Sequence, residues 1–222
     1  MKKFSIAIDG PAGAGKSTIA KIIAQRLKIE YIDTGAMYRA ITLKIIRNGT
    51  DINNIDEIIE LLEKTDINFI NGRVYLDGED VSEEIRLPEI GKLVSQVAAI
   101  KEVREKLVAI QRDIAKNKSV IMDGRDIGTN VLKDAEIKIF LVASVEERAK
   151  RRYKELLEKG IEVSYDDIVK EIEKRDYIDS TREVNPLRKA DDAIVVNNTN
   201  KTLEEVVEEI LNIVCKKLRC KV

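Results

Sequence analysis

Residues 10–18 combine glycine, lysine and hydroxyl side chains in an order that could bind phosphate. Two glycines separated by four residues come directly before a lysine and a serine. Glycines let the backbone curl until its amide N–H groups point at phosphate oxygens, lysine can reach the outer phosphates, and a serine hydroxyl can ligate Mg²⁺. A glycine-rich turn without a ligand is the alternative, but an apolar run before the loop and a helical pattern after it favour a nucleoside triphosphate site. The predicted site comprises Gly10, Pro11, Ala12, Gly13, Ala14, Gly15, Lys16, Ser17 and Thr18, with Ser17 as the metal ligand.

Several arginines could hold a second anion. The guanidinium fork grips phosphate and stays charged at neutral pH. One arginine alone is more often a solvated surface residue, but several clusters beside a phosphate-binding loop favour a kinase, which must hold two anionic substrates against their repulsion. The clusters are Arg148, Arg151 and Arg152 at helical spacing, Arg175, Asp179 and Arg182 four and seven residues apart on one predicted helical face, Arg39, and Arg125 with Asp126.

The chain contains no histidine, which excludes several kinds of chemistry. Ser-His-Asp and Cys-His hydrolases, histidine-ligated metal centres and a histidine general base all require the imidazole ring. Carboxylates, lysine, arginine, backbone amides and an oxygen-bound metal are the groups left for catalysis.

Composition and charge narrow the class further. The 222 residues are 44% hydrophobic, and 39 basic residues against 40 acidic ones give a formal net charge of −1. This balance argues against a general nucleic-acid binder. No apolar run approaches the roughly 20 residues that cross a bilayer, and no export signal is visible, so we expect a soluble cytoplasmic protein without a membrane partner. Cys215 and Cys220 are expected to be thiols of a terminal helix, with a disulfide between them as the alternative.

Short apolar runs alternate with longer helical patterns, which is typical of a parallel α/β sheet. Ligands of such sheets bind at the carboxyl ends of the strands, where Asp33, Asp123, Arg125 and Asp126 fall. The predicted strands are Phe4–Ile8, Ile29–Ile32, Ser119–Met122, Ile137–Val142 and Ala193–Val196. The predicted helices are Lys16–Leu27, Ala36–Asn48, Ile90–Asn117, Val145–Lys159, Tyr165–Thr181 and a last helix that opens with the capping box Thr202-Leu-Glu-Glu205.

Residues 66–81 interrupt this alternation. Asn71-Gly72 and Asp77-Gly78 are hairpin signals on either side of a strand-like segment, Arg73–Leu76. We therefore predict a small antiparallel ribbon inserted into the α/β domain, with a decorative surface hairpin and a functional insertion both open.

Five blocks of sequence together resemble the bacterial cytidylate kinases, from about Phe4 to the last helix. They are Ile6–Thr18, Tyr31–Arg39, Ser95–Ala99 with Val103–Glu105, Asp123–Thr129 and Arg175–Arg182. The resemblance implies an α/β P-loop NTPase fold: a five-stranded parallel sheet flanked by helices, with a small antiparallel β insertion and a helical lid. It implies one nucleoside monophosphate kinase domain over residues 1–222, with its core at 1–60, 91–145 and 185–222, a CMP-binding insertion at about 62–90 and a lid at about 146–184.

The resemblance also implies a reaction and its residues. The γ-phosphoryl group of ATP would pass to CMP or dCMP with Mg²⁺, and we expect a monomer. CMP would contact Thr34, Arg39, Ser95, Arg104, Arg125, Asp126, Arg175, Asp179 and Arg182, while Lys16, Arg125, Asp126, Arg175 and Arg182 would be catalytic. Arg148, Arg151 and Arg152 would contact ATP from the lid. The chain departs from the family pattern at Ile178, at Lys101 and over Asn130–Lys133.

Two other kinds of function stay open at this point. A kinase for UMP, dTMP or shikimate would bind phosphate in the same way and would differ in the base pocket of Ser95, Arg104 and Asp179. A nucleotide-driven switch is less favoured, because the chain lacks the Asn-Lys-x-Asp guanine motif of GTPases. In a module that only binds a nucleotide, the second group of arginines would also have no function.

Overall fold

The computed structural model describes residues 3–70, 72–158 and 160–218. The chain folds as two compact units, one formed by residues up to Tyr31 together with those from Lys118 onward, and the other by Ile32–Asn117. Among the described residues, no helix combines the length and the apolar character needed to cross a membrane.

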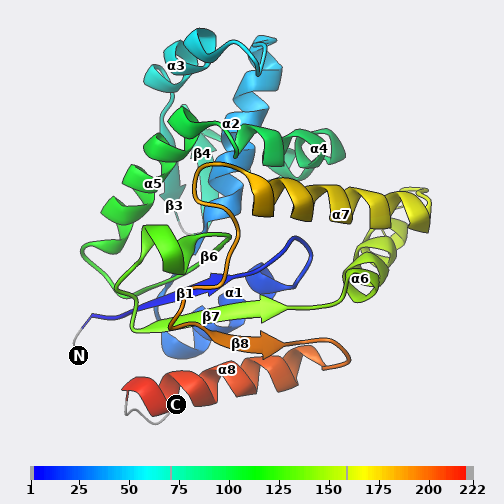
Figure 1. Cartoon of the computed structure of the whole chain (residues 1–222). Coiled ribbons are helices and arrows are strands. Elements are labelled where there is room, and N and C mark those ends of the chain that lie inside the picture. Colours follow the sequence, from blue (N-terminus) through cyan, green and yellow to red (C-terminus); the bar gives the residue numbers. More distant parts are fainter. Residues whose placement is uncertain (1–2, 71, 159, 219–222) are drawn as a thin grey trace. The chain divides into compact units, whose positions relative to one another are not determined.

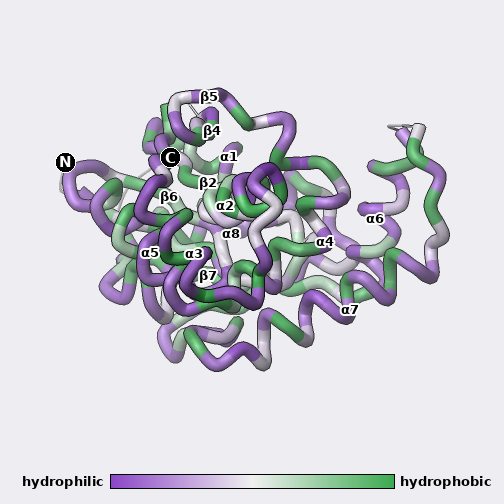
Figure 2. Tube along the Cα trace, turned by 90° about the horizontal axis from the view of Figure 1, so that it is seen from above, coloured by the Kyte–Doolittle hydropathy of each residue, from purple (hydrophilic) through white to green (hydrophobic). Residues whose placement is uncertain are grey.

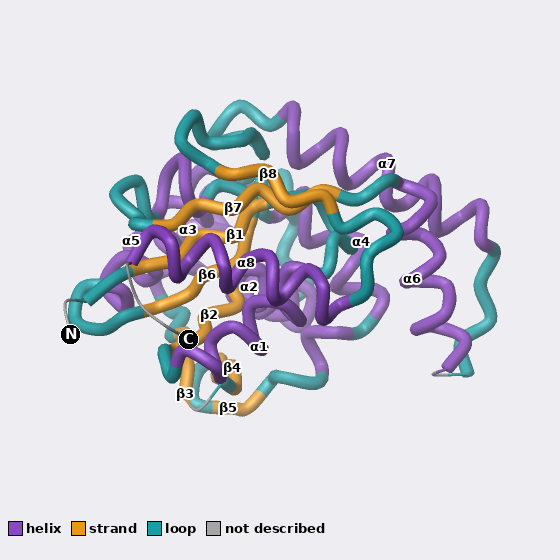
Figure 3. The backbone as a smooth tube through the Cα atoms, turned by 90° about the horizontal axis from the view of Figure 1, so that it is seen from below, coloured by secondary structure: helices purple, strands orange, loops and turns teal. Residues whose placement is uncertain are grey.

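A five-stranded parallel sheet forms the centre of the first unit, in the order β2-β6-β1-β7-β8 (Figures 1 and 3). β1 pairs in parallel with both β6 and β7, and β7 pairs in parallel with β8. The edge strand β2 begins in this unit with Glu30 and Tyr31. The strands are β1 (Ser5–Asp9), β2 (Glu30–Asp33), β6 (Val120–Gly124), β7 (Ile137–Val142) and β8 (Ile194–Asn197), so the five predicted strands are confirmed to within two residues at each end.

The strands of this sheet are apolar because the sheet is buried. Ile6 and Ile8 of β1 and Ile121 of β6 are fully buried, as expected for parallel strands covered by helices. They pack with the apolar sides of α1 (Lys16–Leu27) and α8 (Leu203–Leu218) in one hydrophobic core. The predicted capping box of α8 is confirmed: Glu205 N–H donates to Thr202 Oγ1 at 3.3 Å, and Thr202 N–H donates to Glu205 Oε2 at 2.8 Å.

Two further helices of this unit, α6 (Val145–Glu158) and α7 (Tyr165–Thr181), pack on each other around a small core of their own. Hydrophobic and hydrophilic residues alternate along α7, as Figure 2 shows, and Ile168 and Ile172 supply its buried side. Glu147 N–H donates to Ser144 Oγ at 3.2 Å, so Ser144 caps the start of α6. Lys159, the predicted last residue of α6, lies outside the described residues.

The second unit holds the predicted ribbon, which has three antiparallel strands in the order β3-β4-β5. Asp77 and Gly78 form the second hairpin turn with positive φ angles of 50° and 86°, and Asn71 of the first turn lies outside the described residues. The ribbon and the helices of this unit share one hydrophobic core. The elements are α2 (Thr34–Asn48), α3 (Ile55–Glu63), β3 (Ile67–Ile70), β4 (Arg73–Leu76), β5 (Glu79–Asp80), a 3₁₀ turn at Glu84–Arg86, α4 (Pro88–Val97) and α5 (Lys101–Ala115).

The prediction of one helix over Ile90–Asn117 is wrong. The structure has α4 and α5 with a break between them, where Ile100 is extended with φ −68° and ψ 124°. The break allows Arg104 Nη1 to donate to the carbonyl of Ala98 at 3.1 Å, and that carbonyl lies at a helix end where carbonyls lack partners within the helix. It also lets Val97 and Val103, on the two helices, both be fully buried.

Helix α3 was not predicted, although a local signal precedes it. Asn54 caps the helix by accepting a hydrogen bond from Glu57 N–H at 3.4 Å. Ile58, Leu61 and Leu62 are the buried residues of this short helix. The helix has only nine residues, so packing of its buried side in the second unit stabilises it.

Candidate active site

The loop between β1 and α1 has the geometry expected of a phosphate-binding loop. Gly13 and Gly15 have positive φ angles of 74° and 86°, which glycine adopts without steric cost. A Cβ atom on Gly10 would lie 2.1 Å from the carbonyl oxygen of Leu141 on β7, so only glycine fits there. The loop leads directly into the N-terminus of α1, where backbone N–H groups and the helix dipole favour an anion.

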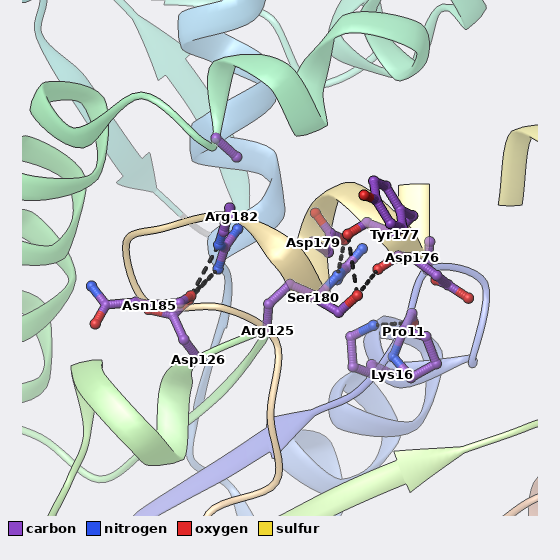
Figure 4. Close-up of polar contacts among 12 residues, drawn as sticks. Pro11, Lys16, Arg125, Asp126, Asp176, Tyr177, Asp179, Ser180, Arg182 and Asn185 are labelled. Atoms are coloured by element: carbon purple, nitrogen blue, oxygen red, sulfur yellow. Dashed lines mark hydrogen bonds and ion pairs between the residues drawn. The ribbon is translucent and has the colours of Figure 1, made fainter. Parts of the chain in front are cut away.

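Lys16 is buried at the start of α1, with 5% of its surface exposed. Its Nζ donates to the carbonyl of Pro11 at 2.7 Å, so the side chain folds back over the loop (Figure 4). Burial and, less strongly, the neighbouring charge of Arg125 lower the pKa of Lys16 to about 7, against the opposing effects of Asp123, Asp179 and Asp9. A bound polyphosphate would supply the negative charge that this ammonium group needs.

Ser17 lies next to a buried carboxylate at the end of β6. Its Oγ donates to Asp123 Oδ2 at 2.9 Å, while the hydroxyl of Tyr31 donates to Asp123 Oδ1 at 2.8 Å. Hydroxyl and carboxylate oxygens are the donors that Mg²⁺ prefers, and Mg²⁺ commonly takes one or two protein ligands together with phosphate oxygens. The chemistry of these donors therefore fits the predicted metal.

Arg125 and Asp179 form an ion pair between the loop after β6 and helix α7. Arg125 Nε donates to Asp179 Oδ2 at 2.7 Å, and 4% of the Asp179 side chain is exposed (Figure 4). Burial alone would raise the pKa of Asp179, but Arg125, with smaller effects from Arg182 and Arg175, holds it below its usual range. The carboxylate is therefore ionised at neutral pH, and the pair is preformed.

Arg182 does not lie on the helical face shared by Arg175 and Asp179, contrary to the prediction. Helix α7 ends at Thr181, and Arg182 has extended backbone angles (φ −59°, ψ 144°) after its N–H closes the last helical turn. Its side chain is 2% exposed, and the guanidinium instead donates to Asp126 Oδ1 at 3.3 Å and to the carbonyl of Asn185 at 2.9 and 2.7 Å (Figure 4). The turn in the chain lets the buried guanidinium form hydrogen bonds with Asp126 and Asn185, which offset the cost of burying its charge.

The three arginines of α6 have different surroundings. Arg148 is buried, and its Nε, Nη1 and Nη2 donate to Ala143 O at 3.2 Å, Ala12 O at 2.9 Å and Asp176 Oδ2 at 2.6 Å. Arg151 donates to Glu147 and to the carbonyl of Asn198, both at 3.1 Å. Arg152 forms a half-exposed ion pair with Glu155.

In the second unit, Thr34 is buried at the first position of α2 and Ser95 is buried on α4. Helix α2 begins at Thr34, two residues before its predicted start, because Asp33 Oδ1 accepts a hydrogen bond from Ala36 N–H at 2.9 Å.

The two arginines predicted in this unit differ in their exposure. Arg39 is half-buried, and its Nη1 lies 3.4 Å from the position that a Cβ atom on Gly35 would take. Arg104 is 1% exposed and stacks over the ring of Tyr38, with 5.5 Å from its Cζ to the ring centroid.

Three further residues near the loop were missed by the sequence analysis. Tyr31 contacts Asp123, as described above. Asn198, just after β8, donates from Nδ2 to the carbonyl of Ala14 at 2.6 Å and so fixes one peptide group of the loop. Asp9 at the end of β1 accepts two backbone hydrogen bonds from residues 127 and 128. Of these three residues, only Asp9 could have been found from the sequence. It is a carboxylate at the end of an apolar, and therefore buried, strand, and a buried carboxylate must accept hydrogen bonds.

Comparison with known proteins adds independent evidence. The family model described as "Cytidylate kinase" matches residues 6–216. A protein named cytidylate kinase from Alkaliphilus oremlandii is 60% identical over 213 residues, covering 96% of this chain and 98% of that protein. Another, from Caldicellulosiruptor saccharolyticus, is 58% identical over 220 residues, covering 97% of each. The crystal structure of a shikimate kinase from Bacteroides thetaiotaomicron, 13% identical, covers 95% of this chain and 98% of its own with a TM-score of 0.50, which bears on the fold alone.

Proposed function

We propose, from the premise that this chain belongs to the cytidylate kinase family and phosphorylates CMP and dCMP with ATP, that five residues of the first unit catalyse the transfer. They are Lys16, Arg125, Asp126, Arg175 and Arg182. The observation that carries this proposal is the burial of Lys16 and Arg182 together with the preformed pair of Arg125 and Asp179. Cationic groups fixed in a site that excludes water stabilise developing charge more strongly than solvated ones.

The proposed ATP site is the loop from Gly10 to Thr18. Its backbone N–H groups would bind the phosphates, and Lys16 would turn from Pro11 toward the outer phosphates. Mg²⁺ would be held by Ser17, whose hydroxyl Asp123 orients at 2.9 Å. When bound, the metal neutralises charge on the β- and γ-phosphates. Asn198 and Arg148 hold the loop in place by donating hydrogen bonds to the carbonyls of Ala14 and Ala12, respectively.

The residues proposed to contact CMP occur in both units. Arg125, Asp126, Arg175, Asp179 and Arg182 belong to the first unit, and Thr34, Arg39, Ser95 and Arg104 to the second. Phosphoryl transfer through a loose transition state requires alignment and charge neutralisation more than covalent chemistry. An oxygen of the CMP phosphate is already ionised near neutral pH, so the reaction needs no histidine base.

We propose a function for each of two segments outside the core. Residues 146–184 would act as a lid over ATP, and residues 62–90 as the insertion next to CMP, while residues 1–60, 91–145 and 185–222 form the core. Closure of the lid would exclude water and so suppress hydrolysis of ATP without an acceptor. The proposal includes a monomer in the cytoplasm, where both nucleotides are available, and sedimentation equilibrium tests the monomer.

A coupled assay of ADP release tests the reaction and the role of Arg182. The acceptors are CMP, dCMP, UMP, AMP, dTMP and shikimate, each with ATP and Mg²⁺, and turnover is expected on CMP and dCMP. Arg182→Ala should lower kcat by roughly 100-fold or more, the effect of losing one preorganised donor to a transition-state charge, and leave the KM for ATP nearly unchanged. Arg188→Ala, an exposed arginine nearby in sequence, is the matched control. An unchanged kcat in Arg182→Ala would refute this role.

A further inference from the structure

Asp9 is a buried carboxylate at the end of β1 that the proposed mechanism does not use. It is 4% exposed. Its Oδ1 accepts a hydrogen bond from Ile127 N–H at 2.8 Å, and its Oδ2 accepts one from Gly128 N–H at 2.7 Å. These N–H groups open a π-helical turn, Ile127–Val131, where the first donors of a helical segment have no partner within it. The carboxylate therefore attaches the turn to the strand that leads into the phosphate-binding loop.

The same turn fixes Asp126. Its carbonyl accepts hydrogen bonds from the N–H groups of Asn130 and Val131, at 2.9 and 3.2 Å, and its Oδ2 accepts one from Asn130 Nδ2 at 3.0 Å. The other carboxylate oxygen, Oδ1, accepts a hydrogen bond from Arg182 Nη2. A displacement of the turn would therefore move Asp126 and, with it, the guanidinium of Arg182.

We propose that Asp9 is a positioning residue for phosphoryl transfer: its carboxylate holds the 127–131 turn, and the turn holds Arg182 through Asp126. This inference rests on the proposed role of Arg182. Asp9 itself does not contact the reacting groups. A carboxylate is needed because only an ionised group offers an acceptor oxygen to each of the two N–H groups.

The two hydrogen bonds that Asp9 accepts depend on pH. Burial raises the pKa of Asp9 to about 6, against the hydrogen bonds from Gly128 and Ile127, which lower it; Asp126 raises it and Lys16 lowers it. Lys138 of β7 also packs on this turn, with its Cδ 3.2 Å from the position of a Cβ on Gly128. A protonated Asp9 would direct its O–H at one of the two N–H groups and lose that contact. The function of Asp9 is thus present above this pKa and lost as the pH falls through it.

A double-mutant cycle separates positioning from a general structural role. Asp9→Asn should lower kcat by roughly 10- to 100-fold, while in an Arg182→Ala background the same change should have less than about a threefold effect, since residues acting as a unit are not additive. Asp134→Asn, an exposed carboxylate just after the same turn, is the matched control and should retain full kcat. Multiplicative effects of Asp9→Asn and Arg182→Ala would overturn the inference while leaving the proposed function intact. If Arg182→Ala keeps full kcat, the role proposed for Arg182 fails and the inference fails with it.

The pH profile gives a second readout. The acid side of kcat/KM for CMP, at saturating ATP, should fall with a slope steeper than one in a plot of logarithm against pH, because loss of the Asp9 contact adds its decrease of roughly 10- to 100-fold to that caused by protonation of CMP. One of the two protons belongs to the CMP phosphate, whose pKa is about 6, and the other belongs to Asp9. In Asp9→Asn the slope should be one, because only the CMP ionisation is left. The wild-type slope tests the inference even if the variant does not fold, since a slope of one in the wild type would overturn it.

Discussion

Replacement of Arg148 by alanine tests whether this arginine acts as a structural brace. In the folded chain its guanidinium donates to the Asp176 carboxylate and to the carbonyls of Ala12 and Ala143, and 4% of its side chain is exposed. The second carboxylate oxygen of Asp176 is already buried without a hydrogen-bond partner among the described residues. Arg148→Ala would therefore leave a poorly solvated negative charge, that of Asp176, on helix α7.

The expected loss in the free energy of unfolding follows from the ion pair between Arg148 and Asp176. Removal of one partner of a buried ion pair costs about 3–5 kcal/mol, and the lower value applies because 24% of the Asp176 side chain is exposed. Unfolding entropy near 2.1 cal/mol/K per residue gives about 0.47 kcal/mol/K for 222 residues. A loss of about 3 kcal/mol then lowers Tm by about 6 °C when the chain unfolds as a whole.

Differential scanning calorimetry measures this shift, with two variants as controls. Arg152→Ala removes a half-exposed ion pair with Glu155 from the same helix and should cost less than about 1 kcal/mol, or about 2 °C. Asp176→Ala in the Arg148→Ala background removes the stranded charge and should recover part of the stability. The reasoning is refuted if Arg148→Ala lowers Tm no more than Arg152→Ala, or if the second substitution recovers nothing.

Two further predictions concern the phosphate-binding loop. Binding of ATP at pH 8 should take up as much as about one proton, because the pKa of Lys16 is about 7 without ligand and rises beside the triphosphate. Calorimetric titration in buffers of different ionisation enthalpy measures this uptake, and a binding enthalpy independent of the buffer would contradict it. Asp123→Asn should raise the Mg²⁺ concentration needed for half-maximal activity by roughly 10- to 100-fold, since Asp123 orients the Ser17 hydroxyl. Asp113→Asn, an exposed carboxylate on α5, should leave the Mg²⁺ dependence unchanged, and an unchanged dependence in Asp123→Asn would contradict the role of Asp123.

The sequence predicted the sheet and the phosphate-binding loop because the signals for both are local. Buried parallel strands must be continuous apolar runs, and the loop needs glycines at fixed distances from lysine and serine. The break between α4 and α5 could not be predicted in this way. The break lets Val97 and Val103, on the two helices, both be buried in the core of the second unit, and this packing is not visible in a sequence with a good helical pattern. Arg182 was misplaced for the same reason, since its contacts with Asp126 and Asn185 determine where it lies after α7 ends.

The contacts of the arginines also separate two roles that spacing alone cannot distinguish. Three of the five N–H groups of Arg148 donate to protein oxygens, two of which are backbone carbonyls, so these contacts fix its guanidinium against Ala12 of the loop. Arg125 engages Asp179 through Nε, and its two Nη amino groups lie on the part of the guanidinium fork that can donate to another anion. A phosphate that approaches Arg125 can therefore be bound while Asp179 keeps the guanidinium in place. This difference leads us to expect that Arg125 contacts the transferred group directly, and that Arg148 affects ATP through the position of Ala12.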